Sequence, residues 1–125
     1  MRVYYESGPA TPMDNQFIEI VNLSALDDFV AKLKGAPGVL FKHSNSCGVS
    51  ARAYGEMSRL PHPIGLVVVQ NARAVSDEIE KRWRVGHETP QVLIVRDDDV
   101  LWNGSHSEVK AADVEAALNE VNSNR

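Results

Sequence analysis

Hydrophobic positions along the chain follow two spacings, one typical of strands and one typical of helices. Short runs rich in apolar and β-branched residues predict strands at residues 17–21, 39–41, 64–69, 91–96 and 100–104. Between and after these runs, apolar residues recur three and four positions apart, which predicts four helices. Their apolar positions are Leu26, Phe29, Val30 and Leu33 in the first helix, Val49, Ala53, Met57 and Leu60 in the second, Ile79 and Trp83 in the third, and Val114, Ala117, Leu118 and Val121 in the last.

Serine and glycine mark the candidate helix ends. Ser24 and Ser76 are expected to cap the first and third helices, because a serine hydroxyl accepts a hydrogen bond from a free N–H group of the first turn. Gly35 and Gly86 are expected near the ends of the same helices. Three consecutive aspartates, residues 97–99, separate the last two strands closely enough to predict a hairpin with a solvated turn.

The resulting order βαβαβαββα predicts an α/β fold in one domain. Strands that alternate with helices favour a mostly parallel sheet with helices on both faces, and the terminal hairpin adds an antiparallel edge, so the sheet is mixed. The length of 125 residues suits a single domain. Gly8, Pro9 and Pro12 interrupt any periodicity in residues 1–15, which are expected to form an irregular arm before a domain at 16–125.

Charge and composition narrow the possible functions. A net charge of −4, with no run of basic residues, argues against nucleic-acid binding. The longest apolar stretches, 64–69 and 92–95, are far shorter than the roughly 20 residues that span a bilayer, so no membrane contact is expected. The N-terminal sequence lacks the apolar core of a secretory signal, and a cytoplasmic location is therefore expected.

The single cysteine, Cys47, lies where a buried strand is predicted to end and a helix to begin. Free N–H groups and the positive end of the helix dipole favour a thiolate at such a position. Lys42 and His43 can add positive potential, and the hydroxyl of Ser50, one turn further on, can donate to the sulfur. The alternative is a structural cysteine, because lone cysteines are often buried and inert.

The other chemical candidates point to structural roles. The four histidines, His43, His62, His87 and His106, fit no common zinc spacing, so no metal site is expected. The segment Arg82-Trp83-Arg84 is expected to end a helix with Trp83 packed inward.

The element order, with a cysteine opening the second helix and Thr89-Pro90 before the penultimate strand, resembles the thioredoxin fold. In that fold the proline follows a cis peptide bond and its loop faces the cysteine. The resemblance therefore implies that Thr89 and Pro90 flank Cys47.

A closer resemblance is to the monothiol bacilliredoxins, the YtxJ-type proteins of the bacillithiol system. It runs from about Val39 to the last helix and is carried by Phe41-Lys42-His43-Ser44, Ser46-Cys47-Gly48-Val49-Ser50, Ser76-Asp77-Glu78-Ile79, His87-Glu88-Thr89-Pro90-Gln91, and Trp102 through Ser105-His106. In that family a proline commonly follows the cysteine, whereas Gly48 stands here.

The resemblance implies a monothiol thiol-disulfide oxidoreductase. Cys47 would take a small thiol, bacillithiol, from mixed disulfides on S-thiolated client proteins, with bacillithiol as co-substrate and no resident cofactor. Ser46, Gly48 and Ser50 would shape the surroundings of the sulfur, and the backbone of Thr89 beside Pro90 would pair with the client.

Two alternatives stay open. Cys47-Gly48-Val49-Ser50 also resembles the CGFS motif of monothiol glutaredoxins, which bind glutathione and can share a 2Fe-2S cluster between two subunits. Glutaredoxins hold a carboxylate of glutathione in the region that corresponds to Ser105, which makes Ser105 a candidate for binding the small thiol, or equally for capping the last helix. The other alternative is a non-catalytic thioredoxin-like adaptor with a buried, slowly reacting Cys47.

Overall fold

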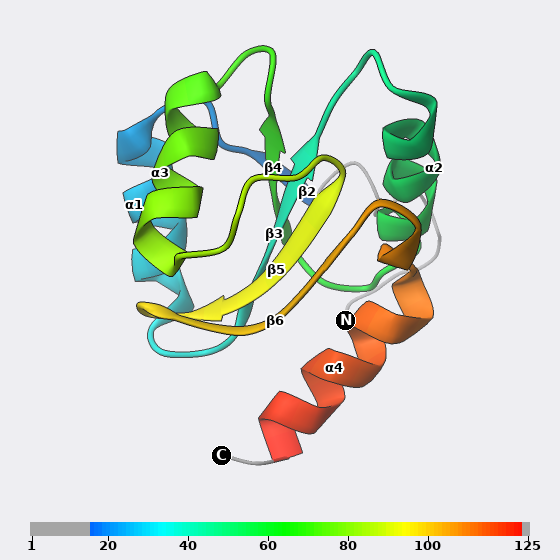
Figure 1. Cartoon of the computed structure of the whole chain (residues 1–125). Helices are drawn as coiled ribbons and strands as arrows, with labels where there is room; N and C mark the ends of the chain where they lie inside the picture. The colour runs from blue at the N-terminus through cyan, green and yellow to red at the C-terminus, as the bar shows by residue number, and fades with distance from the viewer. Residues whose placement is uncertain (1–15, 124–125) are drawn as a thin grey trace.

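A five-stranded mixed sheet forms the centre of the computed structural model, which describes residues 16–123 (Figure 1). The elements are β2 (Phe17–Glu19), α1 (Leu23–Leu33), β3 (Gly38–His43), α2 (Gly48–Met57), β4 (Ile64–Val68), α3 (Arg73–Trp83), β5 (Gln91–Arg96), β6 (Asp99–Ser105), a 3-10 turn η2 (His106–Glu108) and α4 (Ala111–Ser123). The predicted order βαβαβαββα is confirmed. The arm expected at residues 1–15 lies outside the described residues.

The strands lie in the order β2-β4-β3-β5-β6. The first three run parallel, β5 runs antiparallel to β3, and β6 returns along β5 as the expected hairpin. The sheet is therefore mixed, as predicted, with β3 at its centre. Because β5 is antiparallel to β3, the end of β3 and the start of β5 lie at the same edge of the sheet.

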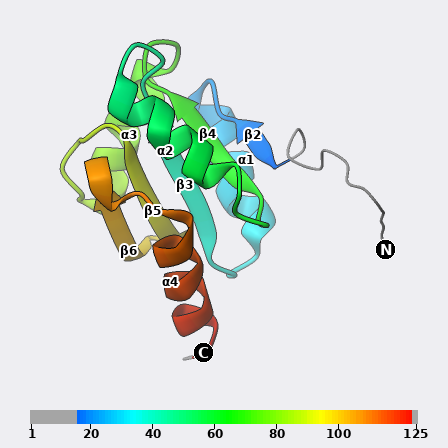
Figure 2. The same cartoon turned by 90° about the vertical axis from the view of Figure 1, so that its right-hand side faces the viewer.

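Helices cover both faces of this sheet, with α1 and α3 on one face and α2 and α4 on the other (Figures 1 and 2). The side chains of β3 alternate between the two faces. Phe41 packs in the core under α2 and α4, and Leu40 packs in the core under α1 and α3. A central strand buried on both faces explains the continuous apolar run seen in the sequence.

Asn22, and not Ser24, caps α1. The Asn22 Oδ1 atom accepts a hydrogen bond of 2.8 Å from the Ala25 N–H group, and Ser24 lies exposed inside the helix. Asparagine caps helices as well as serine does, so the cap is decided by where the extended chain turns into the helix.

The expectation that Ser76 caps α3 is also wrong. The helix begins at Arg73, after Ala72, and Ser76 is a buried residue within it. Its hydroxyl lies 3.2 Å from Nδ1 of His87, in the loop that leads to β5. Ser76 therefore links α3 to that loop.

The buried face of α2 also differs from the predicted stripe. Ala53 and Met57 are buried as expected, but Val49 is 46% exposed and Ser50 is fully buried in its place. A serine is tolerated there because its hydroxyl is hydrogen-bonded, as described below.

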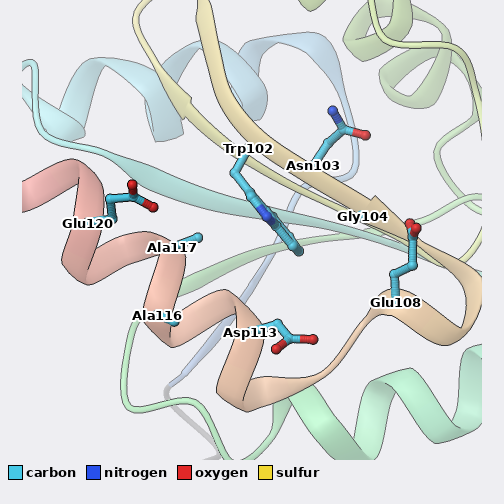
Figure 3. A pocket seen from close by; sticks show the side chains of 8 residues that line it. All are labelled: Trp102, Asn103, Gly104, Glu108, Asp113, Ala116, Ala117 and Glu120. Carbon is cyan, nitrogen blue, oxygen red and sulfur yellow. The ribbon is translucent and has the colours of Figure 1, made fainter.

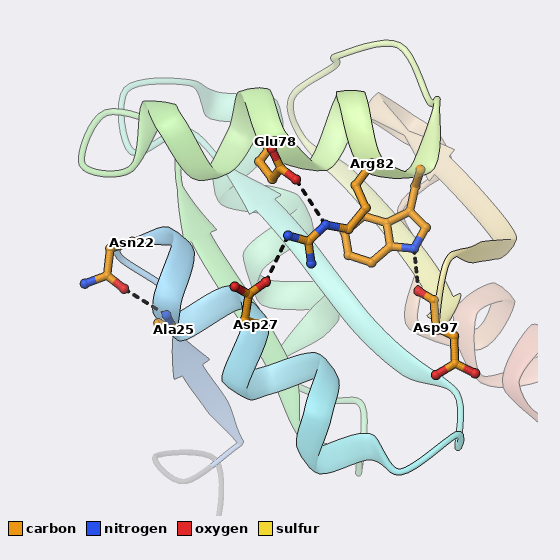
Figure 4. Close-up of polar contacts among 7 residues, drawn as sticks. Asn22, Ala25, Asp27, Glu78, Arg82 and Asp97 are labelled. Atoms are coloured by element: carbon orange, nitrogen blue, oxygen red, sulfur yellow. Dashed lines mark hydrogen bonds and ion pairs between the residues drawn. The ribbon is translucent and has the colours of Figure 1, made fainter.

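Polar contacts at the end of α3 connect it to its neighbours (Figure 4). The Arg82 guanidinium contacts Glu78 at 3.1 Å and Asp27 of α1 at 2.9 Å. Trp83 is buried, as predicted, and its indole N–H donates to the Asp97 carbonyl at 2.9 Å, which joins α3 to the β5–β6 turn.

Between residues 16 and 123, no helix has the length and apolar character needed to cross a membrane.

Candidate functional site

Cys47 lies at the start of α2, beyond the end of the central strand. Residues 44–47 lead from β3 to the helix, and Cys47 occupies the N-cap position in an extended conformation. Its carbonyl accepts a hydrogen bond of 3.0 Å from Ala51, whereas its side chain is half-buried and makes no capping bond. Cys47 therefore lies at the N-terminal end of the helix, and its side chain is not part of the core.

The Thr89–Pro90 peptide bond is cis and lies at the same edge of the sheet. Lys42 of β3 is paired with Gln91 of β5, so Pro90 lies level with the end of β3. The Pro90 carbonyl accepts a hydrogen bond of 2.8 Å from the His106 N–H group. This edge therefore holds the loop before Cys47, the cis-proline loop and the segment after β6, and the cis bond that the resemblance implied is confirmed.

Gln70, which the sequence reasoning missed, holds the loop before Cys47. Its Nε2 atom donates to the hydroxyls of Ser44 at 2.8 Å and Ser46 at 3.1 Å, and its Oε1 atom accepts from the Asn45 N–H group at 3.2 Å. One side chain thus binds three consecutive residues. The available signal was its position as the first polar residue after the apolar strand at 64–69, at the carboxyl end where α/β folds place their sites.

Ser50 stabilises the junction between β3 and α2. Its hydroxyl accepts a hydrogen bond of 2.8 Å from the Ser44 N–H group and lies 2.9 Å from Nδ1 of His43. These contacts involve the strand end and the loop, in place of the hydrogen bond to the Cys47 sulfur that the sequence suggested. Ser50 therefore acts on the position of Cys47 through the backbone.

His43 does not supply the positive potential expected beside the sulfur. Burial lowers the pKa of His43 from its ordinary value, so the imidazole is neutral at pH 7. Its ring packs against Phe41 and Tyr54, at 5.6 Å and 5.1 Å between centroids. Its role at the junction is packing and hydrogen bonding.

Lys42 points to the face covered by α1 and α3 and is fully buried. Its Nζ atom has no hydrogen-bond partner among residues 16–123, and the same holds for Oε1 of Gln91, the residue paired with it across β3 and β5. Burial lowers the pKa of Lys42 to about 8, although the carboxylates of Glu80, Asp77 and Glu88 favour the charged form. A buried ammonium group without a partner destabilises the fold.

Replacing Lys42 by methionine is expected to raise the free energy of unfolding by about 1–3 kcal/mol at pH 7, because an apolar side chain of similar length removes this penalty. The pKa of Lys42 is about 8 in the folded protein and 10.5 when it is unperturbed. Between these values the unfolded chain binds more protons, so wild-type stability rises with pH. Urea unfolding of both proteins, measured from pH 7 to pH 10.5, gives the difference in their free energies of unfolding. This difference should be largest below pH 8 and should shrink toward pH 10.5. A difference that does not change with pH would contradict the explanation.

Ser105, His87 and His106 have partners within the fold. Ser105 caps η2: its side chain accepts a backbone hydrogen bond, and its own N–H group donates to Glu108 at 2.9 Å. Ser105 therefore caps this 3-10 turn and not the last helix, α4, which begins at Ala111. His106 contacts Glu88 at 2.7 Å, and His87 contacts Ser76. Within the described residues, no group of three or more histidine, cysteine or acidic side chains is placed to hold a metal ion.

Two hollows flank the segment after β6. A groove of about 680 Å³ lies between α2 and residues 106–115, and its lining includes Arg52 and Lys110. A smaller hollow of about 450 Å³ lies between β6 and α4, where Figure 3 shows the Trp102 ring beside α4. Its charged lining residues are the carboxylates of Glu108, Asp113 and Glu120. The two hollows therefore differ in charge.

Comparisons with solved structures show the fold. A protein with a thioredoxin fold shares 23% sequence identity at a TM-score of 0.76, over 84% of this chain and 96% of that one. Thioredoxin from Trypanosoma brucei brucei shares 12% identity at a TM-score of 0.70, over 87% and 93% of the two chains. Thioredoxin from Fasciola hepatica shares 11% identity at 0.67, over 82% and 96%. At these identities the similarity shows the thioredoxin-like architecture alone.

The family is shown by a separate comparison. The model of the family described as monothiol bacilliredoxin BrxC matches residues 18–114, which include the strand before Cys47, the cis-proline loop and most of the β6–α4 segment. The chain therefore belongs to the monothiol bacilliredoxin family, whose members are thiol oxidoreductases with a thioredoxin-like fold.

Proposed function

We propose that this protein removes a low-molecular-weight thiol, bacillithiol, from mixed disulfides on client proteins in the cytoplasm, with the thiolate of Cys47 as the nucleophile. The observation that carries the proposal is the place of Cys47 at the start of α2, half-buried and without a side-chain capping bond, at the edge that holds the cis-proline. A half-buried cysteine outside the core can be reached by a substrate, and the thiolate is the form of a cysteine that reacts with disulfides.

The exchange keeps the number of disulfide bonds constant. The Cys47 thiolate attacks the bacillithiol sulfur of the mixed disulfide, a new disulfide joins Cys47 to bacillithiol, and the client cysteine leaves as a thiolate. Cys47 is the only cysteine in the chain, so no internal thiol can break the new bond. A second bacillithiol thiolate, or the thiolate of another redoxin, attacks the bound bacillithiol sulfur and frees Cys47. The bacillithiol then leaves as bacillithiol disulfide or as a mixed disulfide with that redoxin.

The surroundings of Cys47 suggest how the substrates lie. Thr89, beside Pro90, would pair through its backbone with an extended client segment, as strand addition generally does. Ser46 is held by Gln70 on the approach to the sulfur. At Gly48, a Cβ atom would meet nothing within 4 Å, which leaves open space next to Cys47 for the small thiol. Ser50 fixes the junction, and Ser105 would contribute to the rim through its turn.

Intact-mass measurement tests the proposal. The reduced full-length chain is incubated with a client protein that carries bacillithiol on one cysteine. We expect the chain to gain the mass of one bacillithiol at Cys47 while the client loses it, and prior alkylation of Cys47 to prevent both changes. A client that stays thiolated would overturn the proposal. Cluster absorption in protein purified without oxygen would instead favour the iron–sulfur alternative.

A further inference from the structure

The groove between α2 and the β6–α4 segment begins next to the redox site. On one side it is lined by residues along α2 and just after it, from Val49, two positions after Cys47, to Arg59. On the other side it is lined by residues from His106 to Glu115. The His106 N–H group donates a hydrogen bond to the Pro90 carbonyl, so this second side of the groove is joined to the cis-proline loop. A molecule in the groove would therefore have one end close to Cys47.

Two positively charged side chains that line the groove have no partner among the described residues. Arg59 is paired with Glu56, whose other oxygen accepts a hydrogen bond of 2.8 Å from the Ala111 N–H group. Arg52 and Lys110 are exposed and have no ion pair or hydrogen-bond partner for their side chains among the described residues. The remaining carboxylate in the lining is Glu115. The groove thus carries uncompensated positive charge on a chain whose net charge is −4.

The distance along the helix suits a small molecule. Arg52 follows Cys47 by five residues, which corresponds to about 8 Å along a helix axis. A small thiol whose sulfur lies at Cys47 can therefore place a carboxylate near Arg52. Arginine binds carboxylates through two parallel hydrogen bonds, and lysine adds a compact charge on the opposite wall.

We propose that this groove is the site for the anionic part of the small thiol, with Arg52 and Lys110 binding its carboxylates while its sulfur reacts at Cys47. The proposal rests on the proposed function and names the side chains that hold the carboxylates of its small thiol. The carboxylates of the small thiol bind charged side chains of α2 and of the turn before α4. They do not bind at Ser105, whose backbone N–H group already donates to Glu108.

The test compares two disulfides on two matched pairs of substitutions. One variant combines Arg52→Gln with Lys110→Gln. The control combines Lys81→Gln with Arg84→Gln at the C-terminal end of α3, across the sheet, with the same change in charge. The rate of adduct formation on Cys47 is measured with bacillithiol disulfide, which is anionic, and with bis(2-hydroxyethyl) disulfide, which is neutral. Intact mass reports the adduct in each case.

We expect the groove variant to react about tenfold more slowly with the anionic disulfide and at an unchanged rate with the neutral one, and the control to stay within about twofold for both. Added salt should slow the anionic reaction of the wild type more than that of the variant. The groove proposal would be overturned, and the proposed function left standing, by either of two results. In one, the groove variant and the wild type react with the anionic disulfide at equal rates; in the other, the rate of the variant falls equally with both disulfides. A wild type that reacts with neither disulfide would overturn the proposed function.

Discussion

Replacing Cys47 by alanine is expected to abolish the removal of small thiols from client proteins, leaving only the uncatalysed rate. Cys47 is the single cysteine of the chain, so the variant has no other sulfur that can form the intermediate disulfide. The measurement is the rate at which thiolated client is restored in the presence of free bacillithiol. A variant that restores the client as fast as the wild type would mean that the protein acts without covalent exchange.

The same variant is expected to keep its fold. The structural contribution of residue 47 is its backbone: the carbonyl accepts the hydrogen bond from Ala51, and the side chain makes no capping bond. Alanine preserves that backbone, so the free energy of unfolding should change by less than about 0.5 kcal/mol. Equal melting temperatures for the two proteins would assign the loss of activity to chemistry, whereas a much lower value for the variant would show that Cys47 supports the core.

Replacing Phe41 by alanine is expected to lower the free energy of unfolding by about 3–5 kcal/mol. The Phe41 side chain is fully buried in β3, and it packs in the cluster that joins the sheet to α2 and α4. Removing the ring loses its apolar burial and leaves a cavity that the neighbouring strands cannot close. Since that cluster supports α2, the substitution should also loosen the helix that carries Cys47.

Val49 provides the matched control. It lies on α2 and was expected in the core from its spacing, but its side chain is 46% exposed. Val49→Ala should therefore change the free energy of unfolding by less than about 0.5 kcal/mol. Urea unfolding of both variants measures the difference. Similar losses at the two positions would contradict the assignment of Phe41 to the core and of Val49 to the surface.

The sequence predicted the order of elements because each depends on local spacing. The apolar run at 64–69 became β4 and the stripe ending in Val121 became α4. Asp97 and Asp98 became the turn of the β5–β6 hairpin, and Asp99 is the first residue of β6. The placement of Cys47 at a strand-to-helix junction was also correct, because the change from an apolar run to polar residues marks a strand end. A cis bond at Pro90 came from the family resemblance and is confirmed.

Other features depended on contacts between distant segments. Spacing alone predicted Val49 on the buried face of α2, but Ser50 is buried instead because His43 and Ser44 satisfy its hydroxyl. Gln70 reaches the loop before Cys47 across 24 to 26 positions, which no local pattern encodes. Short-range periodicity thus determined the strands, the helices and the residue that opens α2. Only the tertiary structure decided which polar side chains are buried and which cations stay free, because both depend on what another part of the chain brings into contact.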